Sequence, residues 1–211
     1  MPAPEVELSE VWRQLAGRDH EPLLAGLLAG YREPHRRYHT TTHVRWVLRH
    51  ITHIAAHGEP PTDLPAVQLA ALYHDVVYDP RSADNEARSA LLAGLAAVAL
   101  GWPPLRRQLV ERLVLATAGH TPHDIDEAVL VDADLAILGA APGDYAAYVR
   151  AVRGEYAHVA DDAWRKGRAA VLRGFLTRPQ LFATGAMRTA REAQARTNLT
   201  TELAALADRA R

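Results

Sequence analysis

Three short segments of the chain place histidine or aspartate among apolar residues. Two polar side chains in an apolar segment are costly to bury unless they are paired or bind an ion. Imidazole nitrogens and carboxylate oxygens together form a mixed site that suits manganese, iron, cobalt, nickel or zinc better than calcium. The three groups are His39 with His43, His74 with Asp75, and Asp132 with Asp134.

Each group also has a simpler explanation. A single histidine on an apolar face is more often a hydrogen-bonded core residue than a ligand. Asp132 could cap the helix that follows it, and His39 could hydrogen-bond Glu33 or a backbone carbonyl. The three groups together favour a metal site, because three predicted helices each bring such residues into an apolar context.

The composition excludes several other classes of site. The chain has no cysteine, which excludes disulfides, thiolate zinc sites, iron–sulfur clusters and cysteine nucleophiles. Its formal net charge of −1 gives no basic excess that would indicate nucleic-acid binding. The first ten residues do not resemble a signal peptide, and the longest apolar stretch, near Ala90–Leu100, is too short to span a bilayer. We expect a cytoplasmic protein that binds neither nucleic acid nor membrane, and its oligomeric state stays open.

The elements that position the three groups are predicted to be helical. Apolar residues at spacings of three and four predict a helix over Tyr38–His57, which would place His39 and His43 on one face. Ala66–Tyr78 is apolar almost all round, which is typical of a helix at the centre of a bundle. A short helix over Ala128–Leu138 would carry the last two aspartates.

The rest of the chain reads the same way. Abundant alanine, leucine and arginine favour helix over sheet, and no segment alternates long enough to form a convincing strand. We therefore expect an all-α fold, a single compact bundle of roughly eight or nine helices. The expected organisation is one domain over residues 1–211, with a metal core around 31–140 and a C-terminal helical extension over 141–211.

The order of these groups resembles the H … HD … D order of the HD superfamily of metal-dependent phosphohydrolases. The segments that carry the resemblance are RYHTTTHV (37–44), LYHD (72–75) and DADL (132–135). The closer likeness is to an uncharacterised bacterial branch of predicted phosphohydrolases. Its further blocks are matched by YREP (31–34), VYD (77–79), NE (85–86), GEY (154–156), GR (167–168) and ARTNL (195–199), so the likeness covers nearly the whole chain.

The resemblance implies a set of metal ligands. These are His43, His74, Asp75 and Asp134. His39 fits the first position nearly as well as His43, and Asp132 is the alternative for the last position. The implied cofactor is a divalent transition metal, either Mn, Co, Ni, Fe or Zn, with Mg as a further candidate. Whether one ion or two would bind is left open.

The resemblance also implies a reaction. We expect a phosphomonoesterase or phosphodiesterase in which metal-bound water attacks a small phosphorylated substrate, by family association a nucleotide. The ion would lower the pKa of its water and withdraw charge from phosphoryl oxygens. Asp75 is expected to be catalytic, as the bridge between ion and water. Glu86 could orient the water or protonate the leaving group, or it could be a first-turn acid that favours the helix dipole.

A phosphate substrate also needs positive partners. Arg32, Arg36 and Arg37 lie just before the histidine helix, and a guanidinium group can grip phosphate with two parallel hydrogen bonds. His120 could bind the phosphate or a second metal ion. The alternatives are a solvated basic loop for the arginines and a polar turn for His120.

Two other functional classes remain open from the sequence. One is a non-catalytic helical module with a structural metal site. The other is a di-iron oxygenase of HD type, for which His39, His120 and Asp132 could supply further ligands. Metal-dependent turnover of a generic phosphatase substrate would favour the hydrolase, and the spectroscopic signature of a di-iron pair would favour the oxygenase.

Overall fold

The computed structural model describes residues 3–17 and 20–208, and the regular secondary structure in these ranges is entirely helical. This confirms the expected all-α fold, with ten α-helices and one 3₁₀ helix in the described part of the chain. No helix in that part is both long and apolar enough to cross a membrane. The elements are α1 (Pro4–Ala16), α2 (Glu21–Tyr31), α3 (Thr41–Ala56), α4 (Leu64–Tyr73), α5 (Asn85–Ala99), α6 (Pro104–Gly119), α7 (Ile125–Leu135), η1 (Ala136–Gly139), α8 (Pro142–Glu155), α9 (Asp161–Leu176) and α10 (Gly185–Asp208).

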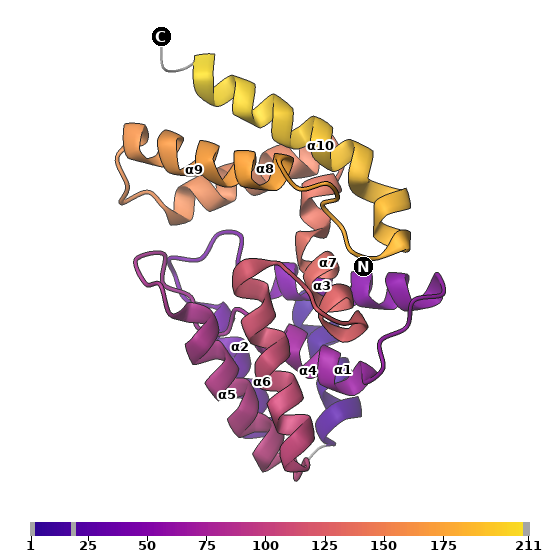
Figure 1. Ribbon diagram of the computed structural model, residues 1–211. Helices are drawn as coiled ribbons and strands as arrows, with labels where there is room; N and C mark the ends of the chain where they lie inside the picture. Colours follow the sequence, from indigo (N-terminus) through magenta and orange to yellow (C-terminus); the bar gives the residue numbers. More distant parts are fainter. Residues whose placement is uncertain (1–2, 18–19, 209–211) are drawn as a thin grey trace.

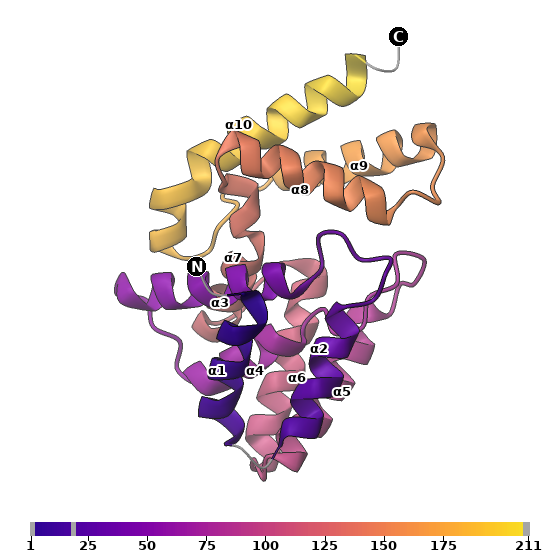
Figure 2. The same ribbon diagram turned by 180° about the vertical axis from the view of Figure 1, so that it is seen from behind.

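The helices form two parts of unequal size (Figures 1 and 2). Helices α1 to α7 make a bundle, and α8, α9 and α10 lie across one end of it. The segment α7–η1 connects the two parts, because α7 packs against α3, α4 and α6 while η1 packs against α8 and α10. Side chains at this end of the bundle therefore face the second part.

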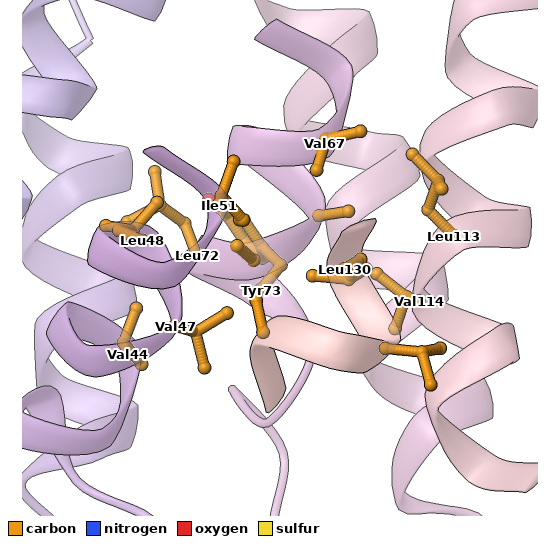
Figure 3. Close-up of a cluster of buried hydrophobic side chains, with 14 of the residues drawn as sticks. Val44, Val47, Leu48, Ile51, Val67, Leu72, Tyr73, Leu113, Val114 and Leu130 are labelled. Carbon is orange, nitrogen blue, oxygen red and sulfur yellow. The ribbon is translucent and has the colours of Figure 1, made fainter. Parts of the chain in front are cut away.

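Helix α4 lies at the centre of the bundle, as its apolar sequence indicates. From Ala66 to Tyr73 every residue except Gln68 is buried. Figure 3 shows side chains of α3, α4, α6 and α7 meeting in this core. Full burial of one such leucine or valine side chain contributes about 1.5–3 kcal/mol. The packing fixes the end of α4, which is where the His-Asp pair begins.

The end of α4 differs from the expectation. The helix stops at Tyr73 instead of continuing to Tyr78, so His74 and Asp75 lie on the turn that follows it. The last carbonyl groups of a helix have no partner within it. Here the Nδ1 atom of His74 lies 2.9 Å from the Ala71 carbonyl oxygen, and the Tyr31 hydroxyl donates to the Leu72 carbonyl at 2.9 Å.

The start of α3 also differs. The helix begins at Thr41, because the Thr40 side chain accepts the Thr42 N–H and caps the first turn. His43 lies in that turn, but His39 precedes the helix and belongs to the connection that follows α2. The expectation that both histidines share one helix face is therefore wrong. They take different directions and have different partners.

The backbone of η1 passes close to that of α10. A Cβ atom on Gly139 would lie 2.5 Å from the Cβ atom of Arg191 and 2.7 Å from its backbone oxygen. The Arg191 side chain also donates to the Gly139 carbonyl at 3.0 Å. A side chain at position 139 would have to displace the backbone of α10. A rotamer change of Arg191 could not relieve this overlap.

We therefore predict that Gly139→Ala lowers the free energy of unfolding by about 1–3 kcal/mol, because overpacking forces the backbone to shift. The matched control is Gly143→Ala in the first turn of α8, where an added Cβ atom meets nothing within 4 Å. That change should stabilise by up to about 1 kcal/mol, because alanine favours helix. Urea denaturation measures both, and equal stabilities of the two variants would contradict the close crossing.

Candidate metal centre

Four of the residues implicated by the sequence meet at the end of the bundle that faces α8 to α10. His43 comes from α3, His74 and Asp75 from the turn after α4, and Asp134 from α7. The two Nε2 atoms of His43 and His74 are 3.1 Å apart. Asp75 Oδ2 lies 3.0 Å from His74 Nε2, and Asp134 Oδ1 lies 3.2 Å from His43 Nε2. Three separate elements thus direct two nitrogens and two oxygens at one point.

The cluster is buried on its histidine side and open on its carboxylate side. The side chains of His43 and His74 are each 1% exposed, whereas those of Asp75 and Asp134 are 16% and 15% exposed. His74, Asp75 and Asp134 line a pocket of about 380 Å³. A small molecule in the pocket would reach the cluster from the carboxylate side.

The two imidazole rings are held differently. His74 directs Nδ1 at the Ala71 carbonyl, so a neutral ring presents the lone pair of Nε2 to the cluster. His43 has a buried Nδ1 without a hydrogen-bond partner among the described residues, and its ring packs against Tyr38 with centroids 4.8 Å apart. A ligating histidine usually donates its second N–H to a fixed acceptor, and in this cluster His74 fits that pattern while His43 does not.

The spacing of the four groups fits a single cation. Two nitrogens that bind one ion at about 2.0–2.1 Å and at right angles would be roughly 3 Å apart, close to the observed 3.1 Å. His43, His74 and Asp75 together could hold a metal ion. Asp134 lies within 3.2–3.7 Å of both histidines and is placed to add a fourth ligand.

The electrostatics of the cluster also favour a bound cation. Burial opposes protonation of His74, but the carboxylates of Asp75 and Asp134 raise its pKa well above the ordinary value, and they raise the pKa of His43 as well. Burial likewise opposes ionisation of Asp75 and Asp134, but the adjacent imidazoles hold the pKa of both well below the usual range. Two ionised carboxylates need two positive charges beside them, from two imidazolium protons or from one divalent ion.

Arg36 has a different role from the substrate binding that we expected. Its side chain is 0% exposed and forms an ion pair with Glu33 at 2.9 Å. The guanidinium also donates to three backbone carbonyls, those of His39 at 3.1 Å, Asp75 at 2.7 Å and Val76 at 2.9 Å. These bonds use the guanidinium N–H groups that would otherwise be available to bind a phosphate group. Arg36 instead ties the segment before α3 to the turn that carries the His-Asp pair.

The other two arginines of this segment also lie outside the pocket. Arg32 forms a bidentate ion pair with Glu5 on the surface, at 2.6 and 2.8 Å. Arg37 is exposed and donates to the backbone carbonyls of Pro34 and Arg36. Neither residue lines the pocket next to the cluster, so the geometry does not support contact by either of them with a phosphate group bound at the cluster.

His39 lines the pocket but is held away from the cluster by Glu155. Its Nδ1 atom is 2.7 Å from Glu155 Oε2, and the other carboxylate oxygen accepts the backbone N–H groups of residues 37, 38 and 39. Burial opposes ionisation of Glu155, but His39 and these N–H groups lower its pKa to about 2. The Nε2 atom of His39 has no hydrogen-bond partner in the described part of the chain. Its geometry favours a proton-carrying role over the metal-ligand alternative.

Glu155 is a residue of the site that sequence reasoning missed. It lies at the end of α8, far along the chain from every group it contacts. The sequence feature that could have identified Glu155 was the GEY segment (154–156), which belongs to the resemblance. Taken alone, the residue types of this segment do not indicate a metal site or a substrate site. Nothing in the spacing of the sequence pairs residue 155 with residue 39.

Two further candidates, Glu86 and His120, also line the pocket. Glu86 lies in the first turn of α5 and forms no hydrogen bond or ion pair with other described residues. His120 has a left-handed backbone with φ of 48°, and its Nε2 atom is 3.2 Å from Asp134 Oδ2. Five aromatic residues also line the pocket, namely Tyr38, Tyr78, Tyr148, Tyr156 and Phe175.

Asp132, the alternative last ligand, has a structural role. Its two carboxylate oxygens accept the backbone N–H groups of Ala183 at 2.9 Å and Thr184 at 2.7 Å, and the Thr184 hydroxyl at 2.7 Å. The side chain therefore caps the segment that leads into α10. Asp134, on a different side of α7, is the aspartate that reaches the histidines.

A scan against protein-family models found no match to this chain. Searches of curated proteins and of solved structures found no match either. The function of the chain must therefore be argued from the chemistry of the site itself.

We predict that Asp132→Asn lowers the free energy of unfolding by about 1–3 kcal/mol, because an amide nitrogen cannot accept the buried N–H groups of residues 183 and 184. The matched control is Asp144→Asn, an exposed acid in the first turn of α8, which should change stability by less than about 0.5 kcal/mol. Thermal and urea unfolding measure both changes. A fully stable Asp132→Asn protein would show that the cap contributes little.

Proposed function

We propose that this chain is a divalent-metal-dependent phosphohydrolase of HD type, with one ion held by His43, His74, Asp75 and Asp134. The observation that carries the proposal is that the Asp75 and Asp134 carboxylates each place an oxygen 3.0–3.7 Å from the two imidazole Nε2 atoms, which are themselves 3.1 Å apart. Such a donor set suits Mn, Fe, Co, Ni or Zn, with Mg as a further candidate. The substrate class is a small phosphate ester, and a nucleotide is the default from the family resemblance.

The chemistry of the site would be shared between the ion and the chain. A bound divalent ion would supply Lewis acidity, which lowers the pKa of water and stabilises charge on phosphoryl oxygens. The carboxylates of Asp75 and Asp134 face the pocket, so they lie between the buried histidines and an incoming substrate. The backbone of Asp75 is held in place, because Arg36 donates hydrogen bonds to the carbonyl of Asp75 and to that of the next residue.

His39 is placed to protonate the leaving oxygen. Its Nδ1–H donates to Glu155, and that buried carboxylate fixes the tautomer and the orientation of the ring. His39 lines the pocket, and Nε2 is the ring nitrogen left to pass a proton to the oxygen that departs from phosphorus. The Tyr78 ring stacks on the imidazole with centroids 4.1 Å apart and keeps its plane fixed. Glu86, in the same pocket, is a second candidate for moving a proton.

The first prediction of this proposal concerns Asp75. Protein purified without chelator should contain one divalent ion and should hydrolyse p-nitrophenyl phosphate or its diester with at least one of Mn, Co, Ni, Fe, Mg and Zn. Asp75→Asn keeps the shape but removes a charge, so activity should fall by about 10³-fold or more while the fold is retained. Elemental analysis and steady-state kinetics measure the two effects.

Asp144→Asn is the control for Asp75→Asn, because it removes the same charge from an exposed position. An Asp75→Asn protein with wild-type hydrolysis would refute the mechanism. A wild-type protein that binds the ion but hydrolyses neither ester with any of the six metals would support a non-catalytic metal site instead.

The second prediction concerns His39. His39→Gln should leave the metal content unchanged, since the residue is not among the four ligands. It should lower kcat for an alkyl phosphate by about 10²–10⁴-fold. The loss for p-nitrophenyl phosphate should be much smaller, because nitrophenolate can leave without a proton. His57→Gln, at an exposed histidine that ends α3, is the control. Equal losses for the two esters would exclude His39 as the proton donor.

A further inference from the structure

A second cleft, of about 640 Å³, lies beside the pocket of the metal centre. Most of its lining residues belong to three connections, at residues 32–40, 74–84 and 156–160, which lie on the left side of Figure 1 and on the right side of Figure 2. The ring of Tyr78 lines both spaces, and its hydroxyl donates to Glu155 at 3.1 Å. The two spaces therefore share a wall but are lined by different groups.

Basic side chains gather around this second cleft. Arg37, Arg81, Arg88, His35 and His158 line it, and all five are exposed. The guanidinium groups of Arg37 and Arg81 form no ion pair with a carboxylate in the described part of the chain. That of Arg88 has only a loose pair with Asp84, at 3.9 Å.

Two of the three acids that line the cleft, Glu33 and Glu155, are bound by other side chains. Glu33 is bound by the buried Arg36 at 2.9 Å, and Glu155 is buried behind Tyr78 and His39. Asp79 accepts the backbone N–H of Arg81 at 2.9 Å within its own turn. The guanidinium groups of Arg37 and Arg81 are therefore left without a carboxylate partner among the described residues, and that of Arg37 donates only to the backbone carbonyls of Pro34 and Arg36.

We propose that this basic cleft binds a phosphate group of a small phosphorylated molecule. Guanidinium groups bind phosphate through paired, charge-assisted hydrogen bonds, and arginines from two different connections could contact the same group from opposite sides. The phosphate has two possible sources, a distal phosphate of the molecule hydrolysed next door or a separate phosphorylated molecule. The binding itself does not depend on the proposed function, whereas the first source does.

The binding test uses metal-free protein, so that no ion can attract the ligand. Inorganic pyrophosphate is titrated in low-salt buffer and followed by calorimetry. The wild-type protein should bind it, and Arg37→Gln combined with Arg81→Gln should weaken binding about tenfold or more. The same pair changed to lysine should retain part of the affinity. Arg107→Gln, which removes an exposed arginine from α6, should bind as the wild type does.

Unchanged affinity in the double glutamine variant would overturn the proposal, and so would a wild-type protein that does not bind pyrophosphate.

Kinetics with the metal-loaded enzyme then distinguish the two sources of the phosphate group. A distal phosphate predicts that the double variant raises KM for a bisphosphate more than KM for p-nitrophenyl phosphate. A separate molecule predicts that pyrophosphate changes p-nitrophenyl phosphate hydrolysis in a way that the double variant loses. A protein that binds pyrophosphate but hydrolyses nothing would refute the proposed function and still support the basic cleft.

Discussion

The buried guanidinium of Arg36 is the contact on which the geometry of the site depends. It binds the carbonyls of His39, Asp75 and Val76 and so joins the segment before α3 to the turn after α4. Such a charge is costly to bury unless its donors are satisfied, and here Glu33 and the three carbonyls satisfy them. The turn can therefore leave the helix at Tyr73 and still be rigid. In this way the adjacent side chains of His74 and Asp75, at the edge of the core, are held in a fixed orientation.

A second buried charge joins the bundle to the helices that cover it. Glu155, at the end of α8, accepts three consecutive backbone N–H groups before α3 and orients His39. Asp132 makes the reciprocal connection, because this residue of α7 caps the segment that enters α10. Each part of the molecule thus supplies a carboxylate that the other part needs. The pocket lies between these two connections, where the aromatic side chains of both parts meet.

Much of this arrangement could be predicted from the sequence, and the failures have clear physical causes. Periodicity identified the helices and the central position of α4, because apolar spacing reports which face is buried. It could not show that α4 ends at Tyr73, since the carbonyls there are satisfied by Tyr31 and Arg36 from distant segments. The positive charge of Arg36 suggested phosphate binding. Only the fold shows that its guanidinium group already donates hydrogen bonds to backbone carbonyls. The pairing of Glu155 with His39 is likewise a tertiary contact with no local signature.

The position of Glu155 along the chain has a consequence for how the protein is made. During synthesis His43, His74, Asp75 and Asp134 all leave the ribosome before residue 155 does, and domains generally fold as units from the N-terminal side. The four-residue cluster can therefore assemble on the nascent bundle while His39 still lacks its carboxylate. Assembly of the cluster and orientation of the His39 imidazole would then be separate events in time. A chain interrupted between residues 134 and 155 would contain the complete cluster without the partner that orients His39.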